Sequence, residues 1–192
     1  QCEIKESFYK IRQNLDSMAY GLYFAELLRA STPVEDKNRE LFRFFLKTLY
    51  LLQEWEDKEA LCRIYEAKLM AIQGFAPEVF SCVNCGKRPS GAVHFSPSLG
   101  GILCLDCHSK DAKAVGISWD TLKALQNILM LTYEKLKDVD MNISTKEQLN
   151  HILSLFISHQ IDRKLKTLQF IKDIKKLNKK SNLSSSGGEP SG

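Results

Sequence analysis

The sequence predicts a mostly α-helical bundle that carries a small inserted four-cysteine module with a short β-hairpin. Apolar residues recur at helical spacing along most of the 192 residues. Between residues 81 and 110 this periodicity disappears, and glycine, proline, serine and cysteine become frequent. We therefore expect a helical domain over residues 1–177, with the module inserted at 81–110, and a disordered tail at 178–192.

Three helices are expected before the module. The first has an apolar stripe with alternating steps of four and three residues: Ile4, Phe8, Ile11, Leu15, Met18, Leu22 and Ala25. The second spans residues 35–53 and is apolar on most sides, which predicts that it is the central buried helix. The third spans residues 58–73, where Gly74 suits a left-handed C-terminal cap and Pro77 prevents continuation.

Two short strands, AVHF at 92–95 and GILC at 101–104, are expected inside the module. Helical periodicity resumes at Ser118, and either Ser118 or Asp120 can cap the next helix. Residues 144–147 (STKE) match a capping box at Ser144, before one long helix or two helices with a break near residue 160. The apolar stripes of this half are Leu122, Leu125, Leu129 and Leu136, then Leu149, Ile152, Leu153, Phe156, Ile161, Leu165, Leu168 and Ile171.

Two Cys-x-x-Cys pairs, Cys82 with Cys85 and Cys104 with Cys107, are separated by 18 residues. This spacing is typical of tetrahedral zinc, because the two-residue gap lets both sulfurs of a pair reach one ion about 2.3 Å away. Gly86 favours the tight turn that such a site needs. Four thiolates leave no coordination position for water, so we expect one structural Zn²⁺ per chain and no zinc hydrolase or deaminase.

Three other interpretations of the cysteines remain open: a redox dithiol, an iron–sulfur cluster and four ordinary core cysteines. A redox site usually has a single Cys-x-x-Cys at the start of a helix, and paired spacing is unusual for core cysteines. His94 and His108 flank the site and are interpreted as supporting or surface residues, not as ligands. His151 and His159 have no partner at metal spacing and are interpreted as ordinary helix residues.

Composition argues against several classes of protein. No apolar run reaches the roughly 18 residues of a membrane span, and the N-terminus does not resemble a signal peptide, so a cytoplasmic protein is expected. The six cysteines are then not a disulfide framework. Cys62 is expected to be buried and inert, and Cys2 has no expected role. We find no nucleophile elbow, phosphate-binding glycine loop or distinctive carboxylate pair, so no enzymatic activity is expected.

Positive charge gathers near the C-terminus, where residues 159–192 carry eight Lys or Arg against three Asp or Glu. Such residues could neutralise phosphates in salt-sensitive nucleic-acid binding, although the residues alone slightly favour a solvated helix face. Phe170 is assigned to the core in preference to base stacking. The candidate nucleic-acid-binding residues are Lys87, Arg88, Lys110, Arg163, Lys164, Lys166, Lys172, Lys175, Lys176 and Lys179.

These motifs resemble the C-terminal part of the RecO recombination-mediator family. That family has a Gly-aromatic-x-Pro lead into its first cysteine pair and a Phe-Ser-Pro…Gly-Gly lead into its second. The matching residues here are Gly74, Phe75 and Pro77, then Phe95, Ser96, Pro97, Gly100 and Gly101. The resemblance covers residues 5–175 and is most specific at 74–107.

The resemblance implies a bacterial DNA-repair protein of the cytoplasm, associated with the nucleoid, that is not an enzyme. Such proteins bind single- and double-stranded DNA, anneal strands, and work with RecR and single-strand-binding protein to load recombinase. The family begins with an OB-fold domain that this sequence lacks, so we expect a C-terminal portion of a longer protein. The alternative is a zinc-stabilised protein-interaction scaffold without useful nucleic-acid affinity.

Overall fold

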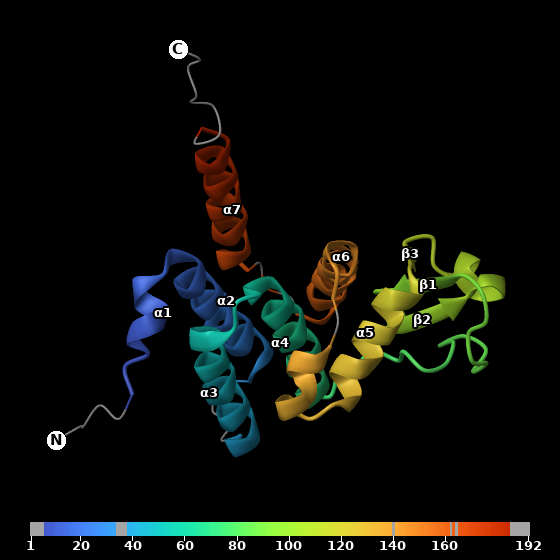
Figure 1. Ribbon diagram of the computed structural model, residues 1–192. Coiled ribbons are helices and arrows are strands. Elements are labelled where there is room, and N and C mark those ends of the chain that lie inside the picture. Colours follow the sequence, from blue (N-terminus) through green and yellow to red (C-terminus); the bar gives the residue numbers. More distant parts are fainter. Residues whose placement is uncertain (1–5, 34–37, 140, 162, 164, 185–192) are drawn as a thin grey trace, which may run out of the picture.

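The computed structural model describes residues 6–33, 38–139, 141–161, 163 and 165–184, and it confirms the helical bundle with a small inserted module. The α-helices are α1 (Tyr9–Gln13), α2 (Leu15–Ser31), α3 (Arg39–Glu54), α4 (Lys58–Ile72), α5 (Trp119–Met130), α6 (Ile143–Gln160) and α7 (Thr167–Ser184). The strands and 3₁₀ helices are β1 (Val93–Ser96), β2 (Gly101–Cys104), η1 (Leu105–Lys110), β3 (Val115–Ile117) and η2 (Tyr133–Asp138). Figure 1 shows the bundle at one end of an elongated molecule, the sheet at the other, and α5 between them.

The sheet is antiparallel with strand order β2-β1-β3. The expected hairpin is β1 and β2, and β3 is a third strand that the sequence did not predict because it is only three residues long and contains Gly116. Side chains alternate between the two faces of a strand. Phe95 and Ile102 accordingly join the main core, whereas Leu103 packs among the cysteines. The cysteine site is therefore packed as a small cluster apart from the main core.

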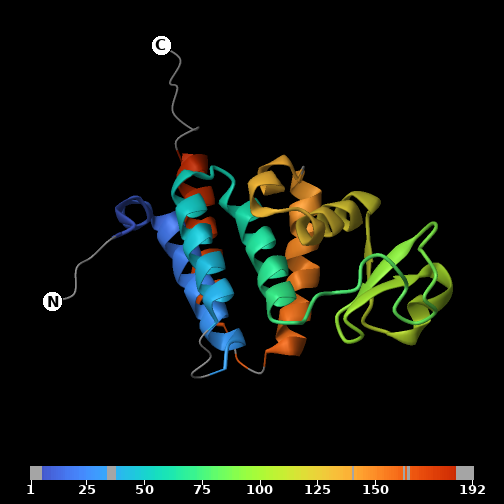
Figure 2. The same cartoon turned by 90° about the horizontal axis from the view of Figure 1, so that it is seen from below.

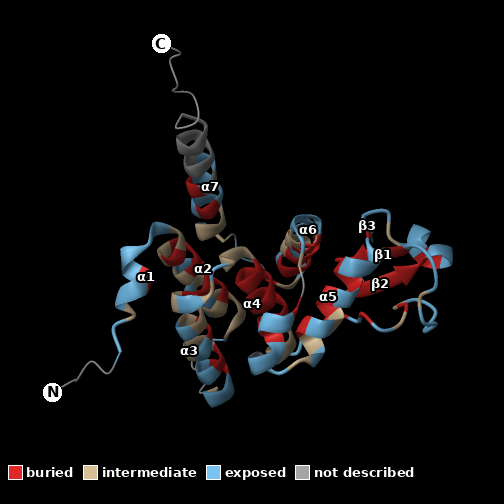
Figure 3. Cartoon of the chain, viewed as in Figure 1, coloured by how far each residue is buried: buried red, intermediate tan, exposed pale blue. Residues whose placement is uncertain are grey.

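Helix α4, not α3, is the central buried helix, so the prediction for residues 35–53 is wrong. Ten residues of α4 are buried but only four of α3, and Figure 3 shows the same contrast. The reason is packing: α4 contacts α2, α3, α5 and α6, whereas α3 lies at the edge of the bundle. Phe42 and Tyr50 of α3 consequently face solvent.

The first expected helix is broken at Asn14, whose side chain accepts a hydrogen bond from the Ser17 amide at 2.9 Å. Asn14 has extended backbone and caps α2, as short polar residues do. The predicted stripe is wrong beyond this point, because Leu15 and Leu22 are half exposed. The buried face of α2 is instead built on its aromatic residues and their neighbours, Ser17, Ala19, Tyr20, Tyr23, Phe24 and Leu27.

The second half follows the predicted stripes more closely, and α5 begins after Ser118 as expected. The capping box at Ser144 is wrong, because α6 begins at Ile143 and its cap is Asn142, which lies two residues before Ser144 and accepts from the Thr145 amide at 2.8 Å. The chain then breaks after Gln160, so two helices form. Helix α7 runs to Ser184, into the predicted tail, while 185–192 lie outside the described residues and their predicted disorder stays untested.

No helix in the described part of the chain combines the length and the apolar character needed to cross a membrane.

Candidate metal centre

The four predicted cysteines come together in the module. Their sulfur atoms all lie within 4.8 Å of one another, and the Cys85 and Cys104 sulfurs are 3.8 Å apart. Four sulfurs placed tetrahedrally about 2.3 Å from one ion would be separated by about 3.8 Å. Cys82, Cys104 and Cys107 are buried and Cys85 is exposed. The cluster is therefore close to the size of a single tetrahedral metal site.

The first pair sits in a tight turn. The Gly86 amide donates to the Cys82 carbonyl at 2.8 Å, and the Cys82 amide donates to the Lys87 carbonyl at 2.9 Å. Gly86 adopts a φ of 73°, which most other residues avoid. The expectation that a glycine allows this turn is confirmed.

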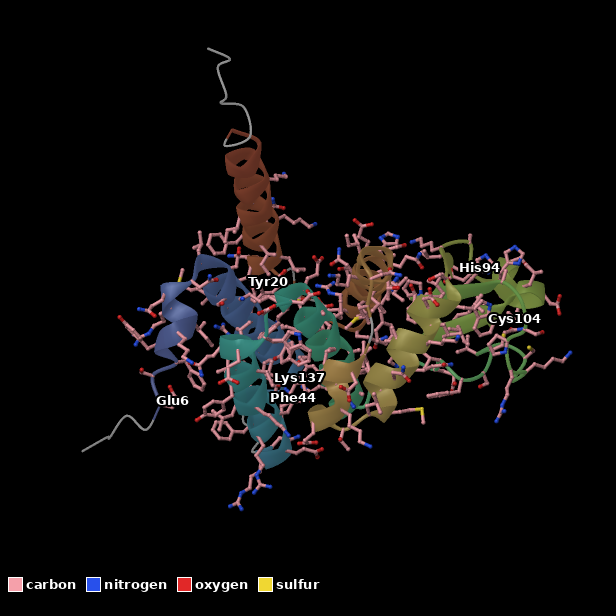
Figure 4. All side chains as sticks on the ribbon, viewed as in Figure 1. Glu6, Tyr20, Phe44, His94, Cys104 and Lys137 are labelled. Atoms are coloured by element: carbon pink, nitrogen blue, oxygen red, sulfur yellow. The ribbon has the colours of Figure 1, made fainter. Side chains whose placement is uncertain are left out.

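The second pair is placed by β2, which ends at Cys104, and by η1, which contains Cys107. The Val83 amide donates to the Ile102 carbonyl at 2.9 Å, so the first turn is fastened to the edge of the same strand. Figure 4 shows Cys104 on the module, well away from the bundle.

Asn84 is a site residue that the sequence reasoning missed. Its side-chain amide donates to the Cys107 sulfur at 3.2 Å. Asn84 lies between the two cysteines of the first pair, and this position is the only signal in the sequence that could have identified it. An amide donor there links one turn of the site to a sulfur of the other.

The pKa values of the cysteine thiols are consistent with a bound cation. Burial raises the pKa of Cys82, but the backbone amides of Cys104, Cys85 and Asn84 oppose it and bring that pKa to about 6. The Asn84 amide lowers the pKa of Cys107, yet burial and the neighbouring thiols raise it to about 12. One thiol therefore loses its proton easily, whereas the negative charge that accumulates on the sulfurs opposes deprotonation of the last thiol. A divalent cation in the centre would remove that repulsion.

The donor set also narrows the class of metal. Four thiolates at tetrahedral spacing suit zinc or a single iron. An iron–sulfur cluster contains several irons, which would hold the cysteine sulfurs farther apart than 4.8 Å. The residues therefore fit one tetrahedral ion.

His94 and His108 stack on each other, with ring centroids 4.9 Å apart, and His94 lies on the sheet face of its partner Leu103. The Nδ1 atom of His108 lies 2.5 Å from the Leu105 carbonyl, which fixes that ring. Neither histidine belongs to the group of possible metal ligands. His151 and His159 are exposed on α6.

The predicted basic residues fall into separate places. Lys87, Arg88 and Lys110 are exposed on the module. Arg163, Lys166, Lys172 and Lys176 are exposed at the start of α7 and just before it, at the other side of the bundle. Lys164 lies outside the described residues, and the side chains of Lys175 and Lys179 are not described. The described members of this set thus lie in two separate places, and the stripe of Lys172, Lys175, Lys176 and Lys179 stays a prediction.

Two further expectations concern single residues. Phe170 is 39 % exposed, so its assignment to the core is wrong. The reason is that α7 packs mainly against α2, and its buried positions are Ile171 and Ile174. The predicted burial of Cys62 is confirmed, since it is fully buried with its sulfur 3.0 Å from the Arg63 guanidinium.

Comparison with known proteins points to one family. Residues 12–169 match the family model described as Recombination protein O C terminal. A DNA repair protein RecO of Alkaliphilus metalliredigens is 33% identical over 164 residues, covering 85% of this chain and 67% of that protein. The DNA repair protein RecO of Caldicellulosiruptor saccharolyticus is 31% identical over 170 residues, covering 88% of this chain and 69% of that protein. The DNA repair protein RecO of Symbiobacterium thermophilum is 32% identical over 175 residues, covering 89% of this chain and 69% of that protein.

Proposed function

We propose that this chain, which belongs to the Recombination protein O (RecO) C-terminal family of DNA repair proteins, is the helical, zinc-stabilised part of a recombination mediator. In this proposal it binds single- and double-stranded DNA and offers protein-contact surfaces to RecR and single-strand-binding protein. It works in the cytoplasm on the nucleoid and breaks no covalent bond. The observation that carries the proposal is the match of residues 12–169 to this family.

Zinc is the metal that we propose for the site. Cys82, Cys85, Cys104 and Cys107 would hold it, and bound zinc would cross-link the two turns without taking part in a reaction. Leu103 is fully buried among these cysteines, so metal binding and packing of the sheet support each other. This proposal favours a structural role over a redox role.

The proposed mechanism is binding. Lysine and arginine side chains neutralise phosphates and release counterions, which makes the affinity depend steeply on salt. Exposed cations on the module and near α7 are separated by the bundle, which supports two points of contact with nucleic acid. A protein that holds two DNA segments at once would be suited to annealing complementary strands.

The test is fluorescence anisotropy with labelled single- and double-stranded oligonucleotides over a range of salt concentrations. The proposal predicts binding whose logarithm falls linearly with the logarithm of salt, with a slope of about −0.7 per phosphate contact on single strands. Absence of binding at low salt would leave the protein-interaction scaffold as the better description.

A further inference from the structure

Two adjoining cavities form one groove on the outer side of α2. The first, with a volume of about 600 Å³, lies between α2 and α3. The second, of about 500 Å³, lies between α2 and the α6–α7 connection. Ala25, Arg29 and Arg163 line both cavities, so the two are continuous. Figure 2 shows the end of α2, the start of α3 and the end of α6 at the same end of the bundle.

We call this surface the arginine groove and define it by Leu22, Ala25, Arg29, Phe42, Phe45 and Arg163. Its two guanidinium groups come from α2 and from the α6–α7 connection, which are far apart in the sequence. The sequence therefore gave no indication that Arg29 and Arg163 line one groove. Only folding of the bundle brings them together.

Positive charge is in excess among the groove's lining residues that the structure describes. Arg29, Arg163 and Lys166 line it, and none of them forms a salt bridge with another described residue. Glu26 is the single acid among the described lining residues, and its carboxylate already accepts the amides of Lys166 and Thr167 at 3.0 and 2.9 Å. Uncompensated guanidinium groups in a concave surface attract an anion such as a phosphate.

Phe42 is the most exposed aromatic residue among the large exposed apolar side chains, at 64 %. It lines the groove beside Arg29 and Arg163, and on α3 it lies next to Arg43 and one turn from Arg39. Both of these arginines are exposed. An aromatic ring left in water contributes little to folding, and its open face can stack on an unpaired base.

We propose that the arginine groove is a binding site for single-stranded nucleic acid, and this inference rests on the proposed DNA-binding function. Arg29 and Arg163 hold phosphates inside the groove, and Phe42 stacks on one base. A paired base has both faces covered in the duplex, so the ring selects a single strand. The positive charge continues beyond the cavities to the exposed Arg39, one turn from Phe42, which suits an extended chain of phosphates better than one compact acidic motif.

The experiment measures binding of fluorescein-labelled oligo(dT) by anisotropy at several salt concentrations. The Arg29→Ala/Arg163→Ala variant should bind about tenfold or more weakly at low salt, and its salt slope should be shallower by about 1.4, or about 0.7 per lost phosphate contact. Phe42→Ala should weaken binding about tenfold with an unchanged slope, because stacking involves no counterion. All three substituted side chains are exposed, so the variants should fold normally.

The matched control is Lys10→Ala/Arg12→Ala, which removes the same charge from the exposed surface of α1. This variant should keep the wild-type slope. If the wild type binds oligo(dT) and the groove variants bind like the control, the groove inference is wrong while the proposed function stands. If the wild type does not bind, the proposed function itself fails. If groove variants keep DNA affinity but lose binding to an acidic peptide rich in Asp and Leu, the groove is a peptide site and the inference is overturned.

Discussion

At the scale of single residues, the module depends on the absence of a side chain at Gly101. The Glu78 amide donates to the Gly100 carbonyl, and the Ile102 amide donates to the Glu78 carbonyl, both at 2.9 Å. A Cβ atom at Gly101 would lie 2.4 Å from the Glu78 carbonyl oxygen and 2.6 Å from a Val83 methyl group. This close approach lets the segment before the first cysteine pair run beside β2.

Gly101→Ala is therefore expected to lower the free energy of unfolding by about 1–3 kcal/mol, as overpacking typically does. The measurement is urea denaturation followed by circular dichroism. Gly116→Ala is the matched control in the same sheet, because its Cβ would meet only His94, at an ordinary distance of 3.7 Å. Equal stability of the two variants would contradict this packing.

A second residue-scale feature is the ion pair between Arg63 and Glu66, which is buried in the bundle. The Arg63 Nη1 atom lies 3.1 Å from the Glu66 Oε2 atom, and the Tyr23 hydroxyl donates to the other Glu66 oxygen at 2.6 Å. Arg63 also donates to the Asn150 side chain on α6. Burial raises the pKa of Glu66 despite the opposing guanidinium. The pair therefore links α2, α4 and α6 through charges that cannot reach water.

Arg63→Met is expected to destabilise the fold by about 3–5 kcal/mol, because it leaves the Glu66 carboxylate buried without its partner. The double variant Arg63→Met/Glu66→Met should recover most of that loss, since apolar side chains of similar size fill the same space. Chemical denaturation of the single and double variants measures both effects. A double variant no more stable than Arg63→Met would argue against the electrostatic explanation.

At the scale of elements, α7 is held at its start by a side chain from α2. Glu26 accepts hydrogen bonds from the Lys166 and Thr167 amides, which would otherwise be unpaired at a helix N-terminus. Burial raises the pKa of Glu26, but the Thr167 hydroxyl and the two amides outweigh it, so the pKa is lowered overall. A lowered pKa means that this stabilisation is present above the unfolded pKa and is lost as pH falls through the folded one.

Glu26→Gln should accordingly cost about 1 kcal/mol at pH 7, the usual value of a cap. The difference from the wild type should shrink as the pH falls below the ordinary carboxyl range and the wild-type carboxylate takes up a proton. Urea titrations at pH 7 and at acidic pH measure it, with the exposed Glu54→Gln as control. A difference that grows toward low pH would contradict the cap.

The elements also show how far the sequence predicts this fold. The stripes of α5 and α6, the cap at Gly74 and the four cysteines follow from local spacing. The buried face of α2 and the central position of α4 depend on which neighbours surround each helix, and no local pattern contains that information. The partnership of Asn84 with Cys107 and of Arg29 with Arg163 arises from tertiary contacts for the same reason.

At the scale of the whole molecule, the module is joined to the bundle by specific contacts from β1 and from the segment before the first cysteine pair. Phe95 of β1 meets Phe156 of α6 edge to face, with centroids 5.9 Å apart. The Gln126 side chain on α5 donates to the Val79 carbonyl at 2.7 Å. A metal that fixes the two cysteine turns would also hold β2 of this sheet, which ends at Cys104 and pairs with Val83. The central claim is that this metal is structural zinc.

The measurement that tests this claim most directly is elemental analysis of the purified protein, with its thiols titrated before and after addition of a chelator. The account predicts about one zinc per chain and four thiols that become reactive only once the metal is removed. A protein without metal, in which the same cysteines readily form a disulfide, would contradict it and favour a redox site.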